Sequence, residues 1–310
     1  MFRWLVNFGF LALPIAATIG ILLGIQSQRE ASGQPPLFVP KLDNKVVETT
    51  YCQKSFGVHP ETKGQEYTLN PNQWGWTQGD AGFLCMNVTT FNNQTYATNT
   101  TAPEWKIFWQ YPQATGDGNN VHAFSNIMVD GGVFPAGLKS VSKIGIDVTW
   151  TMRTDNDTGP ADAVALAAAN VNANVAIDMF MDSDKSKAGD SAKATYEVMV
   201  WFAAYGGSTH TVGQDVGVVA TLNLNGTTFD LYYGVNLNKQ NVLTWKATAP
   251  AQDFHGDLRP LIDEIFKLGR TGYPTEADYL GYFSFGSETY FSDKPVTFSV
   301  PSLSVDVRTN

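Results

Sequence analysis

Short runs in which apolar and polar residues alternate with a period of two recur along most of the chain. Successive side chains of a β-strand point to opposite faces, so this alternation is typical of strands with one buried face. Gly, Asn, Asp and Ser separate the runs, as they do at the turns between antiparallel strands. The pattern predicts an all-β sandwich or barrel. The clearest runs cover residues 143–152, 174–182, 194–202, 216–224, 228–236 and 297–307.

One segment, residues 255–269, does not follow this alternation. Its apolar residues recur at helical spacing, Lys267 lies near its end and Gly269 follows as a stop. We therefore expect one amphipathic helix that packs on the β domain. With 310 residues and 43% hydrophobic content, the chain can form a single β domain with a sizeable core. The helical stripe consists of Leu258, Leu261, Ile262, Ile265 and Phe266.

The composition argues against a nucleic acid partner. Only 16% of the residues are charged and the net charge is -9, so no positive surface is available for a phosphate backbone. Aromatic residues make up 13% of the chain and include eight Trp, which suits stacking against flat apolar faces such as those of sugar rings. The alternative is that most of these aromatic side chains only fill the core.

The N-terminus carries a targeting signal. After Arg3, an uncharged and mostly apolar run extends from Trp4 to Ser27. It is longer than the roughly 7–15 apolar residues of a cleaved signal peptide, and no clear small-residue cleavage site follows. We therefore expect a membrane tether through residues 4–25, with a cleaved signal peptide over residues 1–27 as the alternative. Either reading places the protein outside the cell by the secretory pathway, secreted or anchored.

The polar stretch over residues 28–49 contains three prolines and predicts a linker before a folded domain at 50–310. Five glycosylation sequons agree with a secretory route and are interpreted as exposed loops. In that compartment the two cysteines, Cys52 and Cys85, are expected to form a disulfide, with two free thiols as the alternative. The sequon residues are Asn87, Asn93, Asn99, Asn156 and Asn225.

Three acidic residues lie on strand faces that should not point into the core. Glu197 shares its face with Met199 and Trp201, and a carboxylate between large apolar groups indicates a groove. An ordinary solvent-facing glutamate is the alternative reading. Glu288 follows small residues on its own face, which leaves room for a ligand against the backbone, and Asp178 is the third acid.

Two carboxylates are what the hydrolysis of a glycosidic bond requires. In a retaining enzyme they lie roughly 5–5.5 Å apart. Neighbouring strands are about 4.8 Å apart, so acids that project from one sheet face are expected to reach this separation.

Several short motifs follow one another between residues 52 and 307. They are NQWGW (72–76), GFLC (82–85), WKIFWQY (105–111), NNVHAFSN (119–126), ANVAIDMF (173–180), YEVMVW (196–201), FDLYYGVN (229–236), FHGDL (254–258) and FSFGSE (283–288). Each motif alone is weak, whereas their shared order and spacing are specific. Together they resemble glycoside hydrolase family 12, a family of endoglucanases and xyloglucan-specific endoglucanases.

The resemblance implies a two-sheet antiparallel jelly-roll sandwich of the concanavalin A type, with a concave cleft for a β-glucan polysaccharide. It implies an endo-acting, retaining hydrolase of β-1,4-glucans with Glu197 as nucleophile and Glu288 as general acid/base. A protonated Asp178 would share its hydrogen with Glu197, and the family disulfide maps onto Cys52 and Cys85. The implied sugar-binding residues are Asn72, Trp74, Asn174, Met199, Trp201 and Asn236.

One departure concerns the acid/base. The family usually places Pro and Phe after it, whereas this chain has Thr289 and Tyr290, so the neighbouring subsites are expected to differ. We also expect Glu288 to titrate higher than Glu197, because aromatic burial and the charge of Glu197 would both raise its pKa.

The remaining alternatives concern substrate and class. The sequence leaves open whether unsubstituted glucan or xyloglucan is preferred. A carbohydrate-binding, lectin-like protein on the same fold would predict the loss of one carboxylate, and both are present. We expect a monomer without metal or other cofactor, since the four histidines are scattered along the chain. They are His59, His122, His210 and His255.

Overall fold

The computed structural model describes residues 17–29, 32, 46–91, 96–114 and 121–310. The chain divides into two compact units, Met1–Lys45 with Phe91–Asn93, and Val46–Thr90 with Gln94–Asn310. In the first unit a helix covers residues 17–29. The rest of the predicted targeting run and most of the predicted linker lie outside the described residues. No helix in the described part of the chain is both long and apolar enough to span a membrane.

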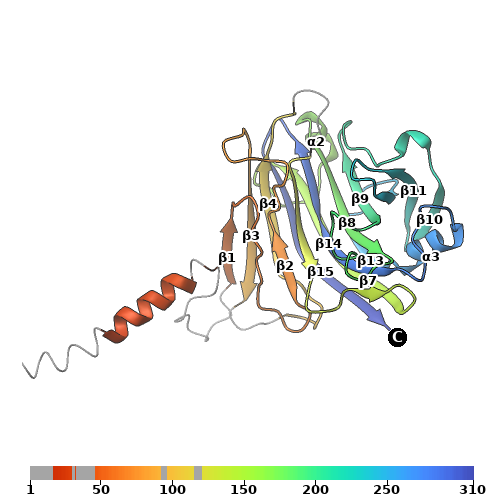
Figure 1. The fold of residues 1–310 in the computed structure, drawn as a ribbon. Coiled ribbons are helices and arrows are strands. Elements are labelled where there is room, and N and C mark those ends of the chain that lie inside the picture. The colour runs from red at the N-terminus through yellow and green to blue at the C-terminus, as the bar shows by residue number, and fades with distance from the viewer. Residues whose placement is uncertain (1–16, 30–31, 33–45, 92–95, 115–120) are drawn as a thin grey trace, which may run out of the picture. The chain divides into compact units, whose positions relative to one another are not determined.

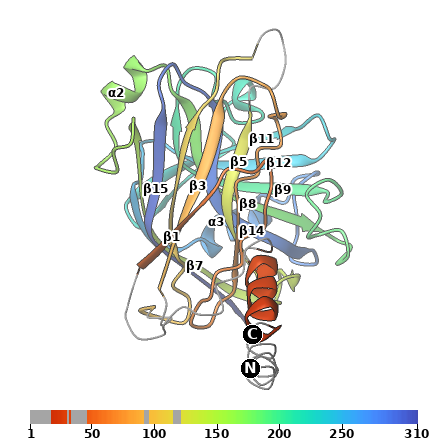
Figure 2. The same cartoon turned by 90° about the vertical axis from the view of Figure 1, so that its left-hand side faces the viewer.

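The second unit consists of two β-sheets, which confirms the predicted sandwich. Figure 2 shows β3 and β15 of one sheet to the left of β5, β8 and β9 of the other. The six-stranded sheet contains, in spatial order, β1 (Val46–Tyr51), β3 (Phe83–Phe91), β4 (Glu104–Gln110), β15 (Val296–Thr309), β7 (Val141–Thr154) and β13 (Asp253–Asp257).

The nine-stranded sheet carries most of the predicted site. Its strands follow the order β10 (Ala220–Leu224), β11 (Thr227–Val235), β12 (Asn241–Ala247), β9 (Tyr196–Tyr205), β8 (Asn172–Asp182), β14 (Tyr279–Phe291), β5 (Ala123–Val129) and β2 (Tyr67–Asn70), with β6 (Ala136–Gly137) beside β14. We expected only antiparallel pairs. In this sheet one pair differs, because β12 and β9 are parallel.

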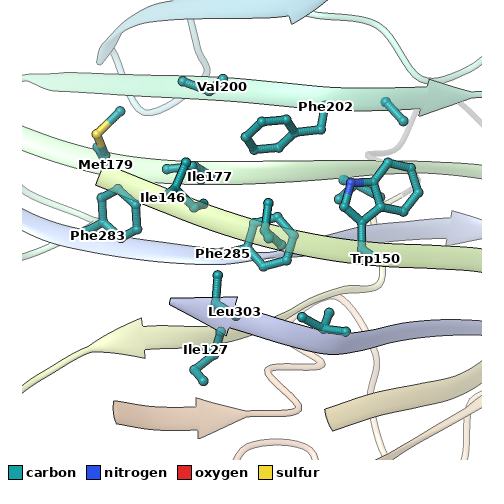
Figure 3. Packing of buried hydrophobic residues seen from close by; sticks show 14 of the residues in the cluster. Ile127, Ile146, Trp150, Ile177, Met179, Val200, Phe202, Phe283, Phe285 and Leu303 are labelled. Atoms are coloured by element: carbon teal, nitrogen blue, oxygen red, sulfur yellow. The ribbon is translucent and has the colours of Figure 1, made fainter. Parts of the chain in front are cut away.

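The alternation seen in the sequence decides which side chains fill the core. Ile177 and Met179 of β8 and Phe285 of β14 point toward Trp150 of β7 and Leu303 of β15, and all five are buried (Figure 3). Full burial of such a side chain contributes about 1.5–3 kcal/mol. Because these residues occupy the inner face, their neighbours in sequence project from the outer face of the nine-stranded sheet.

The predicted helix is present but shorter than expected. Helix α3 (Arg259–Leu268) buries Leu261, Ile262 and Ile265 and ends at Gly269, which has a φ of 54°. The residues before it belong to β13. Figure 1 shows α3 beside β10.

Two shorter helical segments lie outside the predicted amphipathic helix. Helix α2 (Ala163–Ala168) begins at Asp162, whose side chain accepts hydrogen bonds from the backbone of Val164 and Ala165. The sequence leaves the first half of the apolar stretch 161–172 undecided between helix and strand, because its alanine-rich residues show no amphipathic period. A 3-10 turn covers Gln214–Val216.

Cys52 and Cys85 form a disulfide that joins the segment after β1 to strand β3. Of the sequon residues, Asn99, Asn156 and Asn225 are exposed in turns. Asn87 instead lies within β3, and its side-chain amide donates to Glu48 Oε1. Asn93 lies outside the described residues, so the loop interpretation is wrong for Asn87 and untested for Asn93.

Candidate active site

The three predicted acids share the outer face of the nine-stranded sheet. In β9 the side chains of Val198 and Val200 are buried in the core, so Glu197, which directly precedes Val198, points to the outer face. The register places Glu197 opposite Phe180 and places Asp178 one row further along β8. Glu288 of β14 projects from the same face, because Phe285 of that strand is buried in the core.

Glu197 is half-buried and has one hydrogen-bond donor of its own. The side-chain amide of Asn236, just beyond β11, donates to Glu197 Oε2 at 3.1 Å. A hydrogen bond to a carboxylate favours its charged form. Asn236 therefore helps to keep Glu197 ionised.

Glu288 is held by Asn174 of β8. The Asn174 amide donates to Glu288 Oε2, and the backbone N–H of Glu288 donates to Asn174 Oδ1 at 2.9 Å. Asn174 is 0% exposed, so its side chain has little freedom to turn away. The Tyr290 hydroxyl also donates to Glu288 Oε2, at 3.4 Å.

The two glutamates are offset along the strands as well as across them. Glu288 lies beside Asn174, whereas Glu197 pairs with Phe180, six residues further along β8. We had expected the spacing between strands alone to set the separation of the two carboxylates. The offset along β8 shows that it does not. Their charges still interact, since Glu288 contributes to the raised pKa of Glu197. Asp178 lies between these two positions on β8 and interacts electrostatically with both glutamates.

Burial is the main influence on all three acids. It raises the pKa of Asp178 well above its usual value and so favours the neutral form of this carboxyl group. Burial, together with the charge of Glu288, raises the pKa of Glu197 to about 7. Among the hydrogen bonds of the described residues, none joins Asp178 to Glu197, and Asp178 Oδ1 is buried without a partner.

The influences on the two glutamates differ from those on which the expected titration order was based. Burial raises the pKa of Glu288, but the hydrogen bonds from Asn174 and Tyr290 oppose that rise. The charge repulsion instead adds to the rise at Glu197.

The raised pKa of Glu197 predicts a pH-dependent stability. The unfolded chain loses this proton near pH 4.5, whereas the folded protein keeps it to about pH 7. The folded state therefore binds more protons between these values, and stability falls as the pH rises, by at most about 1.4 kcal/mol per pH unit for this group. Urea unfolding at pH 5 and pH 8 should show a smaller loss for Glu197→Gln than for the wild type.

The control for this measurement is Glu104→Gln, a change at an exposed glutamate of the six-stranded sheet. This variant should lose as much stability between the two pH values as the wild type does. Equal losses in Glu197→Gln and the wild type would contradict the raised pKa of Glu197.

Comparison with known sequences agrees with this geometry. The sequence profile described as Glycosyl hydrolase family 12 matches residues 65–308 of the 310-residue chain. The chain belongs to glycosyl hydrolase family 12. This family 12 chain is 30% identical to the xyloglucan-specific endo-beta-1,4-glucanase A of Emericella nidulans over 237 residues, 76% of this chain and 83% of the relative. It is 24% identical to the xyloglucan-specific endo-beta-1,4-glucanase 1 of Phytophthora nicotianae over 241 residues, 77% of this chain and 84% of the relative.

Solved structures show the same fold. The endoglucanase 3 of Trichoderma harzianum aligns with a TM-score of 0.65 at 22% identity, over 86% of this chain and 100% of that one. The family 12 xyloglucanase of Bacillus licheniformis aligns with a TM-score of 0.61 at 18% identity, over 84% and 100%. The jelly-roll sandwich expected for this family 12 chain is therefore confirmed.

Trp74 is the predicted sugar-binding residue with the most accessible surface in this family 12 chain. Its side chain is 48% exposed, and the half-buried Asn72 lies in the same loop. Between them Gln73 is buried, donates to the Gln53 carbonyl at 3.0 Å and accepts from the Tyr111 hydroxyl at 2.7 Å. The buried Gln73 fixes the loop to the domain, so the exposed Trp74 side chain is held in a defined position.

The other predicted sugar-binding residues are either buried or hydrogen-bonded to the two glutamates. Met199 and Trp201 pack with Val242 in a small cluster on the outer face, and Trp201 is only 2% exposed. The Trp201 Nε1–H donates to Met199 Sδ at 3.3 Å. These two side chains support the face and have little surface for a sugar. Asn174 and Asn236 are engaged with Glu288 and Glu197.

Two residues near the site of this family 12 chain were not identified as site residues from the sequence. The sequence marks Tyr290 only as a departure from the family and does not indicate its contact with Glu288. It gives no indication that Gln240 hydrogen-bonds Asn236. A glutamine in a polar turn carries no pattern that would mark it. The unusual residue after the acid/base was a signal for Tyr290.

Proposed function

We propose that this protein is an endo-acting hydrolase of β-1,4-glucans that works by retaining double displacement. The observation that carries the proposal is a pair of half-buried, electrostatically interacting glutamates, Glu197 and Glu288, on one sheet face. Each glutamate has its own asparagine donor. Two carboxylates with distinct roles are what retaining hydrolysis requires. The xyloglucan-specific endoglucanase relatives support β-1,4-glucan as the substrate class.

In the first step the Glu197 carboxylate attacks the anomeric carbon and the bond from that carbon to the leaving oxygen breaks. Glu288 gives its proton to that oxygen, so a glycosyl ester on Glu197 and a free sugar chain result. In the second step Glu288 takes a proton from water, whose oxygen attacks the anomeric carbon and releases Glu197. Both carboxyl groups return to their starting states.

The asparagines support these two roles. Asn236 donates to Glu197 and stabilises the charged form that attacks and later leaves. Asn174 fixes Glu288 by two hydrogen bonds to the same residue, one to the carboxylate and one from the backbone. Fixed geometry of this kind contributes to catalysis because no ordering is needed during the reaction. The burial of Asp178 favours its neutral form, which would add no negative charge between the two glutamates.

The substrate is tested by reducing-sugar release from xyloglucan, barley β-glucan and carboxymethylcellulose with the full chain. The relatives named xyloglucan-specific make xyloglucan the first substrate to test. Activity on any of the three supports the proposal, and the ranking gives the preference. A folded protein that binds these glucans without hydrolysing them would overturn it and favour a lectin-like function.

We expect Trp74→Ala to weaken substrate binding. The indole is exposed on an anchored loop and has a flat face available for a sugar ring. Its loss should raise KM for the polysaccharide by about fivefold to twentyfold, the effect of one stacking contact, with a smaller change in kcat. Val164→Ala, at another exposed apolar side chain, is the control. An unchanged KM in Trp74→Ala would exclude this contact.

We also propose that the protein is a monomer outside the cell. The apolar run after Arg3 supports entry into the secretory pathway, and either tethering through residues 4–25 or cleavage near residue 27 is consistent with it. We propose residues 28–49 as a linker and residues 50–310 as the catalytic domain. Strand β1, which begins at Val46, supports a folded domain in this part of the chain. N-terminal sequencing of the protein secreted by a eukaryotic host distinguishes cleavage from tethering.

A further inference from the structure

A chain of hydrogen bonds stands behind Glu197. Gln240, the residue directly before β12, is 4% exposed. Its Oε1 accepts from Asn236 Nδ2 at 2.9 Å, and its backbone N–H donates to Asn236 Oδ1 at 3.0 Å. The same Asn236 Nδ2 donates to Glu197 Oε2 at 3.1 Å. Gln240 thus contacts both ends of the amide that serves Glu197.

These contacts permit only one orientation of the Asn236 amide. Its two N–H groups point at Glu197 and at Gln240 Oε1, and its oxygen receives the Gln240 N–H. A flipped amide would set its oxygen against a carboxylate and a carbonyl oxygen, both of which only accept. The orientation that donates to Glu197 is therefore the one that satisfies every partner.

Gln240 is itself fixed from the other side. Its Nε2 donates to the carbonyl oxygens of Ser191 and Ala194, each at 2.9 Å, in the segment between β8 and β9. Both of its amide protons are used, so its Oε1 must face Asn236. The chain of contacts thus runs from a backbone segment through two locked amides to Glu197.

We propose that Gln240 is a positioning residue that fixes Asn236 as the donor to Glu197. The proposal rests on the assignment of Glu197 as nucleophile, and Gln240 itself does not touch Glu197. Without the Gln240 side chain, the Asn236 amide loses the acceptor of its second N–H and is held only by the Gln240 backbone N–H, so its hydrogen bond to Glu197 is less firmly enforced. The charged form of Glu197 then loses stabilisation. Glu288 and Asp178, the other acids that interact with Glu197, remain in place.

The test compares wild type, Gln240→Met, Asn236→Ala and the double variant. Methionine keeps the length of the side chain and removes both polar atoms. We expect Gln240→Met to raise the pKa of Glu197 by about 1 and to lower kcat/KM by about fivefold at a pH near the original pKa. In the Asn236→Ala background, the same change should have little further effect on kcat/KM, because the residue through which it acts is gone.

A purely structural role predicts a different result. It would lower the melting temperature, leave the pH profile of kcat/KM unmoved, and reduce activity equally in both backgrounds. That pattern would overturn the proposal. Gln252→Met is the matched control, since Gln252 also hydrogen-bonds a backbone N–H, that of Ala161, in another part of the domain. It should leave the pH profile unchanged.

Two readouts separate this inference from the proposed function. Carbon-13 NMR of the glutamate carboxyls, assigned with Glu197→Gln, gives the pKa of Glu197 without any activity. An inactive wild type would overturn the proposed function, while a raised pKa in Gln240→Met would still support the link from Gln240 to Glu197. If Gln240→Met does not fold, the Asn236 side-chain amide of the wild type should exchange slowly with water. Fast exchange would overturn the proposal.

Discussion

Glu197→Gln should lose nearly all hydrolysis of β-1,4-glucans, with kcat reduced by about a thousandfold or more. Glutamine has nearly the shape of glutamate and can still accept the hydrogen bond from Asn236, so the site should remain assembled. It cannot form the glycosyl ester, because an amide oxygen is a poor nucleophile. Reducing-sugar release from xyloglucan and barley β-glucan measures the loss, with Glu104→Gln as control.

A second experiment identifies the role of Glu197 by its product. In Glu197→Ala, azide supplied in the buffer can occupy the vacated space and attack the anomeric carbon of an activated β-glycoside. One displacement inverts the centre, so an α-glycosyl azide is expected. A β-glycosyl azide, or a Glu197→Gln variant that keeps more than about a tenth of the wild-type kcat, would contradict the assignment of Glu197 as nucleophile.

Glu288→Gln should be the second most damaging change, with a loss that depends on the leaving group. General acid/base catalysis contributes about 10²–10⁴-fold, and a polysaccharide needs a proton on its departing oxygen. An aryl glycoside with an acidic phenol departs without that proton, so its first step should be much less affected. The enzyme should then accumulate as the glycosyl ester, because water lacks its base. Burst kinetics with such a substrate measure this difference.

The contrast between the two substrates is the critical result for Glu288. An equal loss of activity on the polysaccharide and the aryl glycoside would mean that Glu288 acts in some other way, for example by holding the sugar. Thr289→Ala is a suitable neighbouring control, because this buried residue of the same strand is not bonded to Glu288 through its side chain. It should affect both substrates alike.

The sequence predicted the layout of the site because strand geometry leaves few alternatives. Once Val198 and Val200 are assigned to the core, Glu197 must point the other way, and the same holds for Asp178 between Ile177 and Met179. The parallel pairing of β9 with β12 is different, because it depends on contacts between segments far apart in the chain. Alternation within one strand contains no information about its neighbour.

The contacts of individual site residues could not be predicted from the sequence for the same reason. Asn174 and Asn236 were expected to hold sugars, and the structure adds hydrogen bonds from both to the two glutamates that the sequence did not indicate. The titration order was expected from burial and charge alone, without the donors that oppose the rise at Glu288. Trp201 was expected to contact sugar, but the cluster with Met199 and Val242 buries it. Each of these outcomes depends on tertiary contacts of individual side chains.

The central claim is that hydrolysis proceeds through two displacements at the anomeric carbon, and the configuration of the first product tests it most directly. Proton NMR of an early time course with a soluble xyloglucan oligosaccharide separates the α and β anomers before mutarotation mixes them. Two inversions restore the original configuration, so the β anomer should appear first and the α anomer later. An α anomer that appears first would show a single displacement and would contradict the role of Glu197 as a covalent nucleophile.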